Sequence, residues 1–161
     1  MSLINHRRRS DRWHGASQKV GQTAAPLFLD RIDIQCEITP VPFKDISKAA
    51  QGEPSAEIRK RVIRAREIQA ERFSRQKGIH CNAQMSERMI HQYAEPDEAG
   101  ISMLRMAMER LSLSARAYNR ILKVARTIAD LEGCEHVESH HLAEAIGYRT
   151  LDRGDWAERG I

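Results

Sequence analysis

The sequence has little cysteine, few aromatic residues and no long apolar run. Its 161 residues include three cysteines, an odd number at unrelated spacings that favours free thiols in a reducing cytoplasm over a disulfide framework. Aromatic residues make up 5% of the chain, so few large anchors are available for a core. The longest obvious apolar run, AAPLFL, falls far short of the roughly 20 residues of a membrane-spanning helix. The basic start, MSLINHRRRSDRWHG, has no apolar segment behind it and is not a secretory signal.

The motifs of common catalytic sites are missing as well. The sequence contains no G-x-x-x-x-G-K-[ST] phosphate loop, no G-x-G-x-x-G turn, no G-x-S-x-G elbow and no H-E-x-x-H pair. The best metal candidate is CEHVESHH, which offers Cys134, His136, His140 and His141. Adjacent histidines on a helix point about 100° apart, so at most one of the last two could join such a site. We therefore predict no metal site, and interpret these residues as polar groups around a loop and a helix cap.

The excess of positive charge is small. The chain has 26 Lys and Arg against 22 Asp and Glu, a net charge of +4. This balance weakly favours anionic partners such as nucleotides, nucleic acid or an acidic protein surface. Charged residues at 30% of the chain, together with the scarcity of aromatics, predict a mainly α protein with many solvated helix faces.

The first part of the chain predicts a flexible tail followed by one strand. Residues 1–26 show neither helical nor alternating periodicity. Apolar and polar residues then alternate strictly, which predicts a half-buried strand with Ile32, Ile34, Cys36 and Ile38 on its inner face. No second convincing strand follows, and a single strand cannot satisfy its own backbone hydrogen bonds. Either the strand pairs with something absent, or the chain is a piece of a larger fold.

One long basic helix is predicted from Pro54 to about Gln76, with Gly78 suited to its C-terminal cap. Eight Lys or Arg lie between Arg59 and Lys77, against two Glu. We favour a solvated face over a nucleic-acid contact for these charges. The expected apolar stripe consists of Ile58, Val62, Ala65, Gln69 and Phe73.

Three or four shorter helices follow. SERMIHQYA gives one, and EPDEAGISMLRMAMERL gives another that opens at Pro96 and Asp97. LSARAYNRILKVARTIADLEG gives a third, with Ser114 as N-cap and Gly133 closing it. The last helix starts at Ser139 as N-cap. The predicted buried stripe of the third helix consists of Ala117, Ile121, Val124, Ile128 and Leu131.

Three arginines stand in unusual places. Arg116 falls in the first turn of its helix, where exposed amide dipoles disfavour a cation; Arg120 lies one turn on, roughly 40° around the axis. Arg31 stands at the entrance to the predicted strand, between Asp30 and Asp33. Ion pairing with those carboxylates would explain Arg31, and packing along the bundle surface would explain Arg116. The alternative is an anion that the chain itself does not supply, because a phosphate at the helix start favours a guanidinium there.

Several stretches together resemble a known family. They are LDRIDI (29–34), EIRKRVIRAREIQAERF (57–73), HCNAQM (80–85), LSARAYNRILKVARTIADLEG (113–133) and EAIGYRTLDRGDW (144–156). In this order and spacing they resemble the C-terminal part of the magnesium-chelatase-like AAA+ ATPases of the ComM and YifB type, and the resemblance covers about 26–156. The stretch AAPLF, directly before LDRIDI, differs from the residues that the family usually has at this place.

The resemblance implies roles for the unusual arginines. Arg31 matches the arginine finger, which reaches the nucleotide of a neighbouring subunit and stabilises charge on the transferred phosphoryl group. Arg116 matches the sensor-2 arginine of the helical lid, which contacts the nucleotide phosphates, and Arg120 is a further candidate for nucleotide contact. Full-length relatives resemble homo-hexameric motors that use ATP and Mg²⁺ to move DNA, with ComM-like members acting as branch-migration helicases.

The resemblance also implies a domain organisation. We expect a non-native-like tail (1–26), the arginine-finger strand of the AAA+ core (27–49), a long insert helix (50–78) and the helical lid (79–161). The Lon-protease-like domain, phosphate loop and acidic Walker B strand of full-length relatives have no counterpart in this sequence. We therefore expect a truncated or excised piece that binds neither ATP nor Mg²⁺ alone, has no autonomous activity, and needs the missing core and neighbouring subunits.

Two other functions stay open from the residues alone. A free-standing basic helical domain could contact nucleic acid through the helix at 59–77, although that helix offers only Phe73 for stacking on bases. A third option, a helical protein-interaction module without a ligand, is not excluded by the composition.

Overall fold

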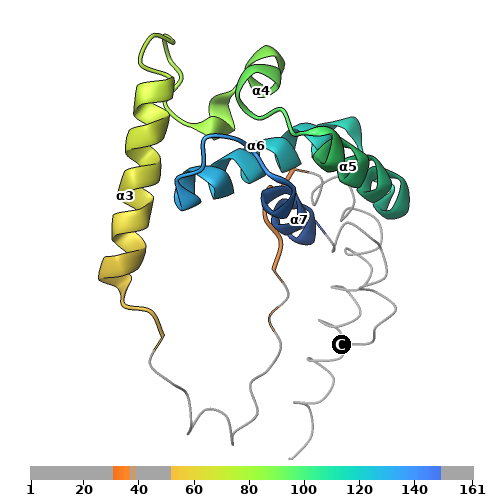
Figure 1. The fold of residues 1–161 in the computed structure, drawn as a ribbon, viewed down its shortest axis with the longest axis horizontal. Coiled ribbons are helices and arrows are strands. Elements are labelled where there is room, and N and C mark those ends of the chain that lie inside the picture. Colours follow the sequence, from red (N-terminus) through yellow and green to blue (C-terminus); the bar gives the residue numbers. More distant parts are fainter. Residues whose placement is uncertain (1–30, 37, 39–51, 150–161) are drawn as a thin grey trace, which may run out of the picture.

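The computed structural model describes residues 31–36, 38 and 52–149, and this part of the chain is mainly α, as predicted. Figure 1 shows α4, α5 and α7 gathered around a central α6, with α3 standing beside this bundle. None of the described helices combines the length and apolar character needed to cross a membrane. In chain order the elements are α3 (Ser55–Arg72), the 3-10 helix η1 (Asn82–Gln84), α4 (Glu87–Tyr93), α5 (Glu98–Leu111), α6 (Ala115–Glu132) and α7 (Ser139–Gly147).

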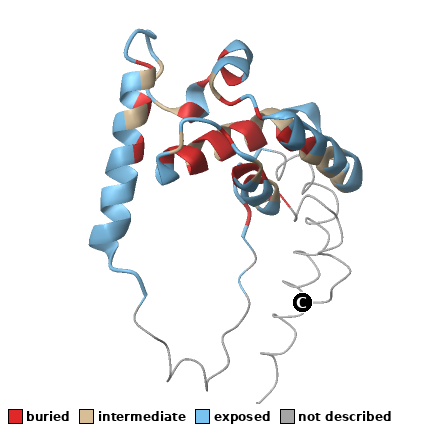
Figure 2. Ribbon diagram, viewed as in Figure 1, coloured by how far each residue is buried: buried red, intermediate tan, exposed pale blue. Residues whose placement is uncertain are grey.

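Helix α6 is the centre of the core and is buried on more than one side (Figure 2). It packs against α7 on one side and against α3, η1 and α4 on others. The predicted stripe is confirmed at Ala117, Ile121 and Ile128, whereas Val124 is half-buried and Leu131 is exposed. Because several elements surround α6, its buried face is wider than one stripe. The further buried residues are Leu122, Ala125, Arg126, Ala129 and Asp130.

Most predicted helix ends are confirmed. The Ser114 hydroxyl accepts a hydrogen bond from the Ala117 amide at 3.1 Å, and Gly133 closes α6 with a φ of 78°. The prediction for the last helix is wrong by one residue, because Glu138, and not Ser139, is its N-cap. The Glu138 amide donates to Nδ1 of His141 at 2.9 Å, so a side chain of the first turn caps the helix from inside.

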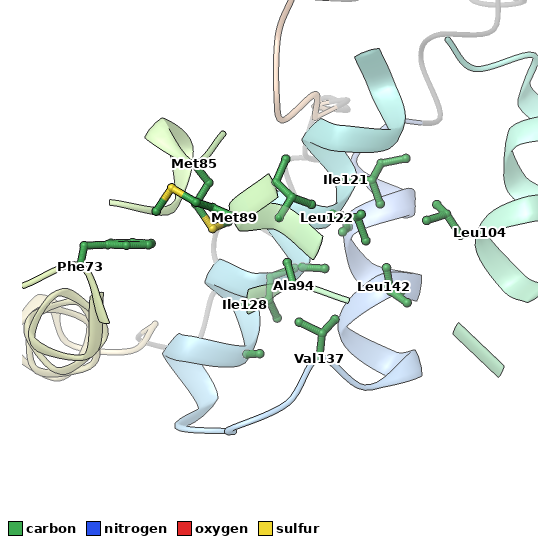
Figure 3. Close-up of a cluster of buried hydrophobic side chains, with 14 residues drawn as sticks. Phe73, Met85, Met89, Ala94, Leu104, Ile121, Leu122, Ile128, Val137 and Leu142 are labelled. Atoms are coloured by element: carbon green, nitrogen blue, oxygen red, sulfur yellow. The ribbon is translucent and has the colours of Figure 1, made fainter. Parts of the chain in front are cut away.

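Helix α3 ends earlier than predicted, at Arg72 instead of Gln76. Phe73 leaves the helix and inserts into the core, where only 2% of it is exposed and its ring meets that of Tyr93 edge-on at 5.8 Å. Figure 3 shows Phe73 entering the apolar cluster from the side opposite Leu104. Burial of this aromatic side chain therefore outweighs continuation of the helix.

The apolar stripe of α3 is buried over only half of its length. Ala65 and Gln69 are buried, but Ile58 and Val62 are each 43% exposed. The N-terminal half of α3 extends away from the bundle, and its ribbon is exposed throughout in Figure 2. The periodicity is correct, but the described part of the chain supplies a partner only for the second half.

The predicted strand is not confirmed. Residues 31–36 and 38 are assigned to no strand. The predicted inner face is wrong, since Ile34 is 51% and Ile38 91% exposed, while Gln35 from the opposite face is buried. A strand needs a neighbouring strand to satisfy its backbone hydrogen bonds, and no strand lies in the described part of the chain.

Candidate functional site

Residues 31–36 lie against α6 and the end of α7, and they are called here the finger segment after the arginine finger that the resemblance predicts at Arg31. The carboxylate of Asp33 forms an ion pair with the guanidinium of Arg120 on α6. The Arg149 guanidinium donates to the backbone carbonyl of Ile32. The Gln35 amide donates to the carbonyl of Tyr148 at 3.0 Å. One side-chain contact and two backbone contacts therefore fix this segment on the helical bundle.

The three predicted site arginines differ in their surroundings. Arg31 and Arg116 are exposed, whereas Arg120 forms an ion pair with Asp33. Arg31 is exposed, and Asp33, one of its two expected partners, pairs instead with Arg120. Asp30, the other expected partner, lies outside the described residues. Arg116 is exposed in the first turn of α6, which contains no acidic residue. The first-turn location that made Arg116 unusual is therefore confirmed.

Positive charge continues along α6 beyond Arg120. Lys123 lies about one turn further on and donates from Nζ to the carbonyl of Ala83 at 2.9 Å. Burial lowers the pKa of Lys123; the Asp33 carboxylate opposes this shift and the Arg120 guanidinium adds to it. Asp33 thus lies in the field of two cations of α6, which favours the docked position of the finger segment.

A buried ionic network joins α3 to α6. Asp130 has a fully buried side chain and accepts from Arg72 of α3 at 2.5 and 2.8 Å. It also accepts from Nε of Arg126 at 3.1 Å and from the side-chain amide of Asn82 at 2.7 Å. Burial raises the pKa of Asp130, but hydrogen bonds from Arg72 and Asn82 and both guanidinium charges bring it below its ordinary value.

Arg126 extends the same network into the connection between α6 and α7. Its Nη1 donates to the carbonyl of Glu135 at 2.7 Å, and its Nη2 donates to that of Cys134 at 2.6 Å. Burial lowers the pKa of Arg126, while the charge of Asp130 acts against that shift. Sequence reasoning missed these two residues, although they are four apart and each follows a buried alanine of α6. This spacing puts a cation and a carboxylate on the buried face, where an ion pair is required.

A cavity of about 630 Å³ lies beside this network, between α3, the end of α4 and the connection after α6. Arg72 and Arg126 contribute to its wall, but both guanidiniums are bonded to Asp130. Glu95 and Glu135 line the same space. The mixture of signs identifies no ligand class.

The four candidate metal ligands of CEHVESHH do not come together in one site. Nε2 of His140 and Nε2 of His141 lie 3.0 and 3.1 Å from the same Oε2 of Glu132, so the prediction that at most one of the pair could join a cluster is wrong. Both rings face the end of α6, and their centroids lie 3.9 Å apart. Ligand atoms of Glu132, His140 and His141 fall within 4.8 Å of one another, and Cys134 and His136 are not among them.

Hydrogen bonding in this cluster favours a helix cap over a metal site. Nδ1 of His141 accepts the Glu138 amide, and a backbone amide can only donate. The ring proton of His141 is therefore on Nε2, which donates to Glu132. A metal ligand needs that nitrogen without its proton, so metal binding would break the cap.

We predict that His140 titrates above its ordinary pKa because of Glu132. The hydrogen bond that His140 donates to the Glu132 carboxylate raises the pKa of His140, and the charges of Glu132, Glu138 and Glu144 act in the same direction. The interaction therefore stabilises the α6–α7 connection fully below a pH of about 6.5 and is lost as pH rises through the higher folded pKa. Glu132→Gln should lower the pKa of His140 in an NMR titration. Glu109→Gln, which removes an exposed carboxylate of α5, should leave it unchanged; an equal shift in both variants would contradict the assignment.

Comparison with known proteins finds a family and several relatives that match most of this chain. The family described as magnesium chelatase, subunit ChlI C-terminal, matches residues 52–149, which include all the described helices. The chain is 40% identical over 127 residues to competence protein ComM of Haemophilus influenzae, covering 78% of this chain and 24% of ComM. It is 42% identical over 127 residues to the uncharacterized protein YifB of Salmonella typhimurium, with the same coverage.

A more distant relative shows the same extent of match. An uncharacterized protein of Mycobacterium tuberculosis is 35% identical over 130 residues, 81% of this chain and 25% of that protein. The chain thus spans about a quarter of the length of the curated relatives that it matches. The predicted resemblance is confirmed: the chain belongs to the magnesium-chelatase-like family of the ComM and YifB type and corresponds to its C-terminal helical domain.

Proposed function

We propose that this chain is the lid part of an ATP-driven motor. In this proposal Arg116 contacts the phosphates of ATP as sensor 2, and Arg31 acts as an arginine finger on the nucleotide of a neighbouring subunit in a homo-hexamer. A separate ATPase core holds the phosphates and Mg²⁺, since the sequence contains no phosphate loop. The motor would act on DNA as a branch-migration helicase.

The observation that carries this proposal is the place of Arg116. Its side chain is exposed at the start of an 18-residue helix, and Ser114 caps the amide of Ala117. The first amides of a helix have no partner within it and carry the positive end of the dipole. An anion there interacts with amides and guanidinium together, which offsets the unfavourable location of the cation. Family membership supports a nucleotide phosphate as that anion.

A chimera of ComM from Haemophilus influenzae tests the proposal. Replacing the matching quarter of that relative by this chain should give an enzyme that hydrolyses ATP in the presence of Mg²⁺, whereas the pure chain should show no hydrolysis above background. A chimera that folds and assembles but does not hydrolyse ATP would contradict the proposal. Clear turnover by the pure chain would contradict the need for a separate core.

A second candidate function is nucleic-acid binding through α3. The exposed half of this helix is rich in basic residues, and two of them are held in exposed pairs, Lys60 with Glu57 at 2.7 Å and Arg61 with Glu53 at 2.6 Å. Arg59, Arg64 and Arg66 are exposed on the same helix. Binding through these charges would weaken steeply with added salt in a fluorescence-anisotropy titration with duplex DNA. No binding at low ionic strength would exclude this function for the isolated chain.

A further inference from the structure

Arg120 lies at the joint between the finger segment and α6. Its side chain is 25% exposed and pairs with the carboxylate of Asp33. The Nε–H of Arg120 is buried and has no acceptor among the described residues. A buried donor without an acceptor lowers stability, so an arginine is not the most stabilising residue for this position. What it provides is a fixed contact between two parts of the chain that are 87 residues apart.

The backbone of the finger segment is held on either side of this pair. Buried Arg149 binds the carbonyl of Ile32, and the amide of Gln35 binds the end of α7. Arg31 directly precedes the first of these contacts and is exposed. A side chain on an anchored backbone searches fewer positions than one on a free loop, which is what a group that must reach a distant anion requires.

Arg116 belongs to α6, the helix that carries Arg120. It is one helical turn before Arg120, a separation of about 6 Å along the axis of α6. Through Arg120 and Asp33, the exposed arginine of the finger segment and the exposed arginine of α6 are therefore attached to the same helix. A rotation of α6 and α7 would carry both of them.

We propose that Arg120 is a positioning residue, whose ion pair with Asp33 fixes Arg31 relative to Arg116 so that the lid and the finger move as one unit. The inference rests on the proposed function for the roles of Arg31 and Arg116, and Arg120 itself contacts no nucleotide in it. Movement of the lid in one subunit would then change the finger that this subunit offers to its neighbour. The ion pair of Arg120 with Asp33 would thereby couple the nucleotide sites of two adjacent subunits.

Hydrogen exchange of the Gln35 amide tests the joint in the chain itself. This amide donates to Tyr148 only while the finger segment is docked. Arg120→Ala and Asp33→Asn should each speed its exchange by about two- to five-fold, the range expected for a partly exposed ion pair. Arg105→Ala removes an exposed guanidinium of α5 and should change nothing. Equal exchange rates in Arg120→Ala, Asp33→Asn and the unaltered chain would overturn the inference.

The ComM chimera tests the consequence for catalysis. Arg120→Ala should lower kcat by on the order of ten-fold with KM for ATP unchanged, because the finger is misplaced while nucleotide binding is kept. The charge reversal R120D with D33R should restore both turnover and the protection of Gln35. Failure to restore either would overturn the inference. If Arg31→Ala leaves turnover unchanged, the proposed function of Arg31 fails, and the Gln35 exchange still decides whether Arg120 holds the segment.

Discussion

Arg116→Ala in the ComM chimera is expected to lower kcat for ATP hydrolysis by about 10- to 1,000-fold, the range seen when a charge-stabilising group is removed. The physical reason lies in the proposed site, where the guanidinium and the first amides of α6 would face one phosphate anion. The helix should survive, since Arg116 is exposed and Ala has the higher helix propensity. Steady-state kinetics of the purified chimera, with circular dichroism as a folding check, measure the effect.

Two matched variants make this result specific. Arg116→Lys keeps the charge but loses the forked donor geometry, so it should recover only part of the turnover. Arg105→Ala, on the exposed side of α5, removes the same charge elsewhere and should leave kcat unchanged. Kinetics of Arg116→Ala equal to those of the unaltered chimera would assign Arg116 to the solvated surface of the bundle.

The sequence was a good guide to the helices because their signals are local. Caps such as Ser114 and Gly133 act through neighbouring amides and carbonyls, so the residues near each end suffice to predict it. The end of α3 was missed because Phe73 leaves the helix for a core built by α4 and α6, and no local signal reports that core. The finger segment was misread for the same reason, since burial of Gln35 depends on contact with Tyr148.

The arginines show the same division between local and distant information. The unusual place of Arg116 followed from a helix cap two residues away. The partner of Arg120 could not be predicted, because Asp33 is 87 residues distant and meets α6 only after the bundle has formed. The buried ion pair of α6 was missed because Arg126 and Asp130 look like solvated charges unless the width of the buried face of α6 is known.

Asp130→Ala is expected to lower the free energy of unfolding by about 3–5 kcal/mol, because it leaves the buried charge of Arg126 and the partly buried charge of Arg72 without a counterion. This is a large part of the roughly 5–15 kcal/mol that stabilises a typical domain. The folded pKa of Asp130 is below its ordinary value, so its contribution is present above a pH of about 4 and is lost as pH falls through the folded pKa. Urea denaturation followed by circular dichroism at neutral pH measures the loss.

Glu53→Ala is the matched control for this loss. Glu53 also binds an arginine through both carboxylate oxygens, at 2.6 and 2.9 Å, but the pair with Arg61 is exposed. Its removal should lower stability by less than about 1 kcal/mol, because water replaces the lost partner. If Asp130→Ala fails to fold, Asp130→Asn keeps the shape and should give a smaller, measurable loss. Equal losses in Glu53→Ala and Asp130→Ala would mean that water, and not Asp130, balances the charges of Arg72 and Arg126.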